Sequence, residues 1–130
     1  NFVKSVHELD VYLLAFELQQ DIYGLSKHFP KEELYSLTDQ VRRSSRSIGA
    51  NISEAWAKRR YEAHFISKLT DSDGEREETT HWVLSAHACQ YISDSDKVAL
   101  VQRLDHLGSM INKMIGNARS WCFPHEQSDR

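Results

Sequence analysis

The amino-acid sequence predicts an all-α protein, an antiparallel up-down-up-down four-helix bundle. Three observations carry this prediction. Apolar residues recur at spacings of three and four along four long segments, which is typical of helices that bury one side. Short breaks separate these segments, so consecutive helices are expected to pack antiparallel. No stretch of the chain alternates between apolar and polar residues as a half-buried strand does.

The length and charge of the chain suit one soluble domain. Its 130 residues suffice to bury a substantial core. We expect a single bundle domain over residues 1–123 and a disordered tail over residues 124–130. The formal net charge of -3 gives no overall basic character, so nucleic acid is not the default partner.

Nothing in the sequence indicates export or membrane insertion. No apolar run reaches the roughly 20 residues of a membrane-spanning helix, and no basic-then-apolar signal segment opens the chain. Along a helical hairpin, Cys89 and Cys122 fall roughly 40 Å apart at about 1.5 Å per residue, too far for a disulfide bond. Two free thiols favour a cytoplasmic location.

The first helix is expected from about Leu9 to His28. It ends there because Pro30 disfavours helical geometry in the residue before it. Tyr12, Phe16 and Tyr23 are interpreted as widening its buried stripe. The stripe itself consists of Val11, Leu14, Ala15, Leu18, Ile22, Leu25 and Phe29.

The second helix is expected as one long segment from Leu34 to Arg60. Its buried stripe contains many small residues, which allow a neighbouring helix to approach closely. They are Ser44, Ser45, Ser47, Gly49, Ala50 and Ser53. From residue 31 to 60 the chain has seven basic and four acidic residues, so this helix carries a local excess of positive charge.

The third helix, expected from about Tyr61 to Ile92, has an acidic middle. The sequence TDSDGEREETT is almost free of apolar residues. Since the second and third helices are expected to be antiparallel neighbours, the acids can face the arginines. The expected ion pairs join Arg42, Arg43 or Arg46 to Asp73, Glu75 or Glu78. The alternative is a helix that breaks at Gly74.

The fourth helix has the most regular pattern in the chain. Ser93 and Asp96 form a typical N-terminal capping arrangement, and Pro124 stops the helix. Between them the apolar residues follow an unbroken 4-3-4-3 spacing. They are Leu100, Leu104, Leu107, Ile111, Met114, Ala118 and Trp121.

The sequence offers no catalytic or metal-binding motif. A di-metal bundle needs two Glu-x-x-His motifs, and the chain has one, Glu78 with His81. It has no His-x-x-x-His, Cys-x-x-Cys, Gly-x-Ser-x-Gly or phosphate-binding loop. We therefore expect no enzyme activity, no metal and no cofactor.

Three groups of residues are candidates for an interaction site. A polar network on the second helix, satisfied by the third helix or by a neighbouring subunit, would use Gln40, Arg43, Asn51 and Glu54. Aromatic residues left exposed beside the buried stripes are candidates for a subunit contact, namely Tyr35, Trp56 and Trp82. A basic face that tracks a phosphate backbone would use Arg42, Arg46, Lys58, Arg59 and Arg60.

One stretch carries a family motif. The run FPKEELYSLTDQVRRSSRSIGANISEA resembles the hallmark of the bacterial 23S rRNA intervening-sequence proteins, and the resemblance extends over roughly residues 2 to 120. The matching residues in this run are Phe29, Pro30, Glu33, Leu37, Thr38, Gln40, Arg42, Arg43, Ser47, Ile48, Asn51, Ile52 and Glu54. Those that fit the third helix of the family are Phe65, Glu78, Thr79, Trp82, Ala86, Tyr91 and Ile92. The departures are Gly49, Ser53 and Ala55, where the family has proline, alanine and glycine.

The resemblance implies an antiparallel four-helix bundle that assembles into a homopentameric ring. Some related accessory proteins work with a reverse transcriptase and direct a basic surface toward nucleic acid. Two functional hypotheses follow: a non-enzymatic homo-oligomer in protein interaction or assembly, and a nucleic-acid-binding accessory protein as the alternative. The positions of the charged side chains distinguish the two hypotheses, because nucleic-acid binding requires the basic side chains to lie together on an open face.

Overall fold

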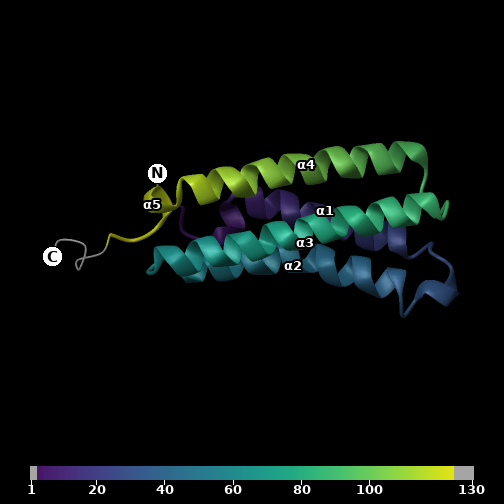
Figure 1. The fold of residues 1–130 in the computed structure, drawn as a ribbon, viewed down its shortest axis with the longest axis horizontal. Helices are drawn as coiled ribbons and strands as arrows, with labels where there is room; N and C mark the ends of the chain where they lie inside the picture. Colours follow the sequence, from purple (N-terminus) through teal and green to yellow (C-terminus); the bar gives the residue numbers. More distant parts are fainter. Residues whose placement is uncertain (1–2, 125–130) are drawn as a thin grey trace.

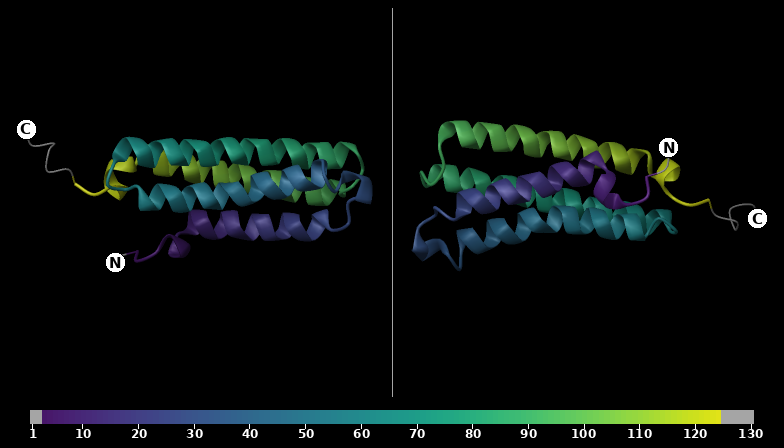
Figure 2. Two further views of the ribbon diagram at one scale, coloured as in Figure 1. Left: turned by 90° about the horizontal axis from the view of Figure 1, so that it is seen from below. Right: turned by 180° about the vertical axis from the view of Figure 1, so that it is seen from behind.

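The computed structural model describes residues 3–124, and within them it contains helices and no strands. The four long helices are α1 (Asp10–Ser26), α2 (Leu37–Ala57), α3 (Glu62–Ala88) and α4 (Asp94–Gly116). The short helices are the 3-10 turns Val6–Glu8 and Lys31–Glu33 and the single α-helical turn α5 (Ala118–Trp121). Figures 1 and 2 show the long helices side by side and alternating in direction. The predicted all-α four-helix bundle is therefore confirmed.

The helices form a square in cross-section. α2 contacts α1 on one side and α3 on the other, and α4 closes the square against α3 and, less extensively, against α1. The core between them is filled by side chains that have no exposed area or almost none. The largest are Phe65, Leu18, Ile48, Ile52, Leu69, Leu104, Leu107 and Ile111.

The closest helix pair, α2 and α3, is joined through small hydroxyl residues. The Ser72 hydroxyl donates to the Ile48 carbonyl oxygen at 2.8 Å, and the hydroxyl oxygens of Thr79 and Ser44 are hydrogen-bonded at 2.9 Å. All three hydroxyl residues are fully buried. This contact explains why the middle of α3 lacks apolar residues: small polar side chains there satisfy one another and let the two backbones approach.

Several predicted helix limits are wrong, including two helix ends: α2 ends at Ala57 rather than Arg60, and α3 ends at Ala88 rather than Ile92. α2 begins at Leu37 rather than Leu34, because a 3-10 turn and a bend at Ser36 precede it. α3 continues through Gly74, so the alternative of a break there is excluded. The predicted fourth helix is interrupted at Asn117, whose backbone leaves helical geometry before α5 begins. The apolar spacing continues across this interruption because Ala118 and Trp121 still pack on the core.

Other local predictions are confirmed. The Ser93 hydroxyl accepts the backbone N–H of Asp96 at 3.0 Å and caps α4. Cys89 and Cys122 are both free thiols. Within the described residues, no helix is long and apolar enough to cross a membrane. From residue 125 onward, the predicted tail lies outside the described part of the chain.

One end of the bundle is fastened by a hydrogen-bond network between two connections. The Glu33 carboxylate accepts hydrogen bonds from the Ser36 hydroxyl at 2.7 Å and from the Tyr91 hydroxyl at 2.9 Å. Leu37 N–H also donates to it at 3.2 Å. Beside it, Gln90 adopts a φ of 66°, the left-handed conformation that ends α3. The network links the α1–α2 connection to the α3–α4 turn.

This network predicts a pH-dependent stability. The hydrogen bonds from Ser36 and Tyr91 lower the pKa of Glu33, so its contribution is present above the ordinary glutamate pKa of about 4.3 and is lost in acid. The bond to Glu33 raises the pKa of Tyr91 from 10.0 to about 12, so the phenol's contribution is lost as pH rises through that interval. We expect Tyr91→Phe to lower Tm most near neutral pH. A Tm difference that stays constant from acidic to strongly alkaline pH would contradict this expectation.

Candidate interaction surfaces

The four residues predicted as a polar network do not form one network. Arg43 bridges α2 to α3 through Glu75, at 3.4 Å, and through Glu78. Hydrogen bonds from Trp82 and from Arg43 lower the pKa of Glu78. The expected ion pairing of the second-helix arginines with the acidic third helix is confirmed for Arg43.

The other three members of that group are separate from Arg43. The Glu54 carboxylate lies 2.8 Å from the Lys68 ammonium on α3. The Asn51 amide donates to the Ser47 carbonyl oxygen within α2. The Gln40 side chain makes no hydrogen bond with any described residue. Sequence spacing placed these residues on one helix but did not identify their separate partners.

The five predicted phosphate-binding cations divide into two groups at different ends of α2. Arg42 and Arg46 lie over the Tyr23 ring of α1, with guanidinium carbons 4.8 and 5.3 Å from the ring centroid. The Lys27 ammonium lies over the same ring at 4.8 Å. Arg42 also donates to the Ser26 hydroxyl at 2.7 Å. Among the described residues, none of these three cations forms an ion pair with a carboxylate.

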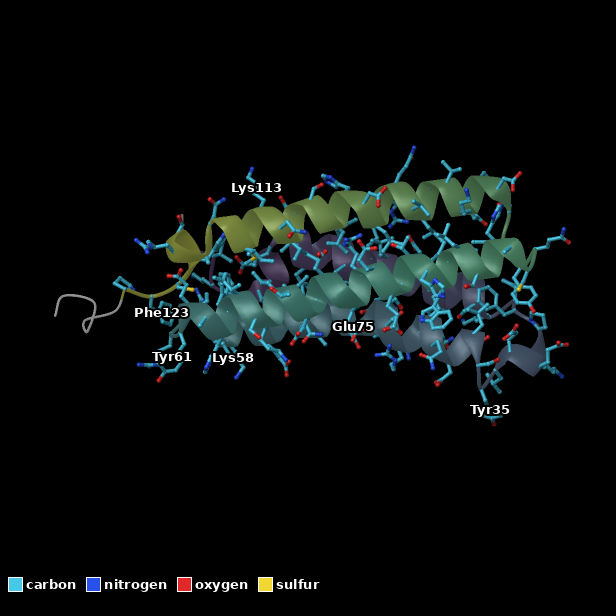
Figure 3. The ribbon with its side chains drawn as sticks, in the orientation of Figure 1. Tyr35, Lys58, Tyr61, Glu75, Lys113 and Phe123 are labelled. Carbon is cyan, nitrogen blue, oxygen red and sulfur yellow. The ribbon has the colours of Figure 1, made fainter. Side chains whose placement is uncertain are left out.

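The second group follows the end of α2. Arg59 is held between two aromatic rings, 3.6 Å from the Trp56 centroid and 4.8 Å from that of Phe123. Burial lowers the pKa of its guanidinium. Lys58 and Arg60 remain exposed. Figure 3 shows Lys58 and Phe123 at the same end of the bundle, opposite the end that carries Tyr35. The five predicted cations of α2 therefore do not form one continuous surface.

Of the predicted subunit-contact residues, only Tyr35 is largely exposed, at 92% of its surface. The expectation of exposure is wrong for the two tryptophans. Trp56 packs on the core and meets Trp121 edge to face, and Trp82 packs on the core while its indole N–H donates to Glu78 at 3.0 Å. The α5 turn, which brings Trp121 to Trp56, could not be foreseen from the spacing of apolar residues.

Sequence reasoning missed an exposed apolar strip on α1. Leu13 and Phe16 are 50% and 45% exposed, so the prediction that Phe16 widens the buried stripe is wrong. Phe16 stacks on Tyr12, with ring centroids 6.1 Å apart. The helix α2 approaches Tyr12 at Gly49, where an added Cβ would lie 3.7 Å from the ring. The aromatic residues thus cover the outer side of the α1–α2 contact.

A second feature missed from the sequence is the buried Arg76 on α3. Its guanidinium is held by Asp73 at 2.7 Å and by Glu77 at 3.2 Å. The side chain extends across Gly108 of α4, where an added Cβ would lie 2.6 Å from Arg76 Nε. The sequence predicts that Asp73 pairs with an arginine of the second helix, whereas in the structure it pairs with Arg76 on its own helix.

No described group of side chains resembles an active site. Within residues 3–124, no three His, Cys, Asp or Glu side chains are arranged to hold a metal ion. A hollow of about 440 Å³ lies between the N-terminal segment and the end of α4. Its charged lining residues Glu8, Asp10 and Lys113 are all exposed, which favours a solvated hollow.

The fold and its surfaces define an all-α four-helix bundle with aromatic and charged side faces. A family model described as 23S rRNA-intervening sequence protein matches residues 7–113. This chain belongs to that family. It is also similar to the crystal structure of a protein with unknown function from the S23 ribosomal protein family of Bacteroides thetaiotaomicron VPI-5482. The two are 26% identical with a TM-score of 0.73, over 81% of this chain and 97% of the other. The search of curated proteins gives no match.

Proposed function

We propose that the protein is a cytoplasmic, non-enzymatic homo-oligomer that acts in protein interaction or assembly, with the pentameric ring implied by the family resemblance as its form. The observation that carries this proposal is the exposed apolar strip of α1. Leu13 and Phe16 are each about half exposed on a helix whose remaining large apolar residues pack on the core.

The neighbourhood of this strip supports a protein contact. Tyr12 and Phe16 supply aromatic area, and Arg42 and Arg46 lie on the same side of the bundle, over Tyr23. Aromatic residues and arginine are enriched in protein interfaces, and clustered apolar exposure marks interaction sites. Because both arginines are already positioned by the Tyr23 ring, little side-chain freedom would be lost on association.

Nucleic-acid binding is the second candidate. It is favoured by the three cations around Tyr23, which have no carboxylate partner among the described residues, and by the exposed Lys58 and Arg60. The two basic groups are separated by about 18 Å along α2, from the 1.5 Å rise per residue. The apolar residues beside the first group have no counterpart in phosphate-backbone binding, so this candidate ranks second.

Light scattering in solution, with and without a short RNA duplex, tests the proposal. We expect a mass several times that of the 15.1 kDa chain, unchanged by RNA even at low salt. A monomer at every attainable concentration would contradict the homo-oligomer. A mass that increases with RNA and loses this increase steeply with added salt would establish the nucleic-acid alternative instead.

A further inference from the structure

The side of the bundle formed by α1 and α2 combines aromatic residues with unpaired positive charge. We call it the basic face and define it by Tyr12, Phe16 and Tyr23 with Lys27, Arg42 and Arg46. The rings of Tyr12 and Phe16 stack, and the three cations surround the Tyr23 ring. A partner for this face must supply both apolar area and negative charge.

The side formed by α3 and α4 combines those two properties. We call it the acidic face and define it by Leu84, Val98 and Val101 with Glu77 and Asp105. Leu84 and Val98 are 45% and 48% exposed, and Val101 is half-buried. Glu77 and Asp105 are exposed. Glu77 also pairs with Arg76 at 3.2 Å, whereas Asp105 has no ion-pair partner among the described residues.

Helical spacing places these residues along one contact. Arg76 crosses from α3 to Gly108, which fixes where the two helices meet. Glu77 follows Arg76 directly, and Leu84 lies seven residues further, two turns along the same side. On α4, Val98, Val101 and Asp105 precede Gly108 at spacings of three and four. The acidic face therefore borders the outer side of the α3–α4 contact.

The two faces lie on opposite sides of the molecule. The helix contacts are α1 with α2, α2 with α3, α3 with α4 and α4 with α1. In such a square the α1–α2 side is opposite the α3–α4 side. The two side views in Figure 2 agree with this arrangement of the four helices.

We infer that the basic face of one copy packs against the acidic face of the next copy. This inference rests on the proposed homo-oligomer and specifies its interface. Three cations meet two carboxylates, and exposed aromatic side chains meet exposed aliphatic ones. Such a contact uses two different surfaces of the same chain. Each added subunit therefore leaves one unoccupied surface for the next subunit, and the assembly closes as a ring or continues as a filament.

A second copy fits the basic face better than nucleic acid does. The acidic face supplies apolar area at Leu84 and Val98 for the aromatic part of the basic face. A nucleic-acid duplex, whose bases are already stacked inside the helix, would neutralise the cations and leave these aromatic rings in water. Symmetric pairing of two basic faces is disfavoured, because it would place like charges opposite each other.

Charge reversal on each face tests the inference. The basic-face variant is Lys27→Glu with Arg46→Glu, and the acidic-face variant is Glu77→Lys with Asp105→Lys, which leaves Asp73 to hold Arg76. We expect each to weaken self-association at least about tenfold, because like charges then face one another. The fourfold variant restores opposite charges and is expected to regain the wild-type mass. Glu32→Lys with Lys113→Glu is the control, since both residues are exposed outside the two faces.

A matched pair of leucine variants tests the apolar part of the proposed contact. Leu84→Ser is expected to weaken association, whereas Leu34→Ser is not, although the two leucines are 45% and 46% exposed. Thermal melts followed by circular dichroism establish that each variant is folded. Sedimentation at several protein concentrations gives the association constants.

The outcomes separate this inference from the proposed function. A monomeric wild-type protein overturns the homo-oligomer and the interface together. An oligomeric wild type whose mass resists both reversals overturns the interface alone. The interface is also overturned if only one of the two charge-reversal variants weakens association, or if the fourfold variant stays dissociated. RNA binding that is abolished by the basic-face variant, in a chain whose self-association that variant leaves intact, assigns the basic face to nucleic acid and overturns the inference.

Discussion

Replacement of Ser44 by leucine is expected to lower the free energy of unfolding by about 3 kcal/mol, the upper end of the usual cost of overpacking. Ser44 has no exposed area and lies between α2 and α3, with its hydroxyl bonded to that of Thr79. Leucine has two more side-chain heavy atoms than serine, and it also removes one hydrogen-bond partner of the Thr79 hydroxyl. The two helices must separate to accommodate it.

Ala50→Leu on the same helix is the matched control. Ala50 is exposed, so the added side chain enters solvent and is expected to change the free energy of unfolding by less than about 0.5 kcal/mol. Urea denaturation of both variants measures the difference. If Ser44→Leu unfolds at the same urea concentration as the wild type, the α2–α3 contact is looser than the structure indicates.

Two glycine-to-alanine changes are expected to have opposite signs. In an exposed helix interior this change stabilises by up to about 1 kcal/mol, and Gly74 of α3 has nothing within 4 Å of an added Cβ. At Gly108 of α4 the same Cβ would lie 2.6 Å from Arg76 Nε. Since Asp73 and Glu77 hold that side chain in place, we expect Gly108→Ala to lower the free energy of unfolding by about 2 kcal/mol.

The double variant tests the cause of the Gly108 effect. In an Arg76→Met background, the flexible thioether side chain can move aside, so Gly108→Ala is expected to lose most of its destabilising effect. The thermodynamic cycle of the four proteins, measured by urea denaturation, gives the coupling between the two positions. A coupling near zero would show that Arg76 does not determine the need for glycine at position 108.

Much of the fold follows from sequence pattern alone. The spacing of apolar residues predicts four helices, and the breaks at Pro30 and Ser93 predict where two of the connections fall. Capping at Ser93 and the pairing of Arg43 with α3 were also predictable, because the first depends on local sequence and the second on antiparallel neighbours. These features depend on residues close together in the sequence, or on the single assumption that consecutive helices pack antiparallel.

The side faces were less predictable. The pattern of α1 does not separate Phe16, which is exposed, from Leu18, which is buried, because both are apolar residues near the same stripe. The burial of Arg76 depends on the missing side chain at Gly108, thirty-two residues away in sequence. The division of the basic residues depends on Tyr23 and Phe123, which lie on other segments. Each of these contacts joins distant parts of the chain, where spacing carries no information.

The position of the chain ends has a practical consequence for labelling. The first and last described residues lie at the same end of the bundle, beyond the start of α1 and the end of α4 (Figure 1). A fluorescent domain fused to either end would therefore extend past the tip of the bundle and leave its long sides accessible. Subunits labelled in two colours should exchange and report energy transfer without the labels themselves occupying the contact surfaces.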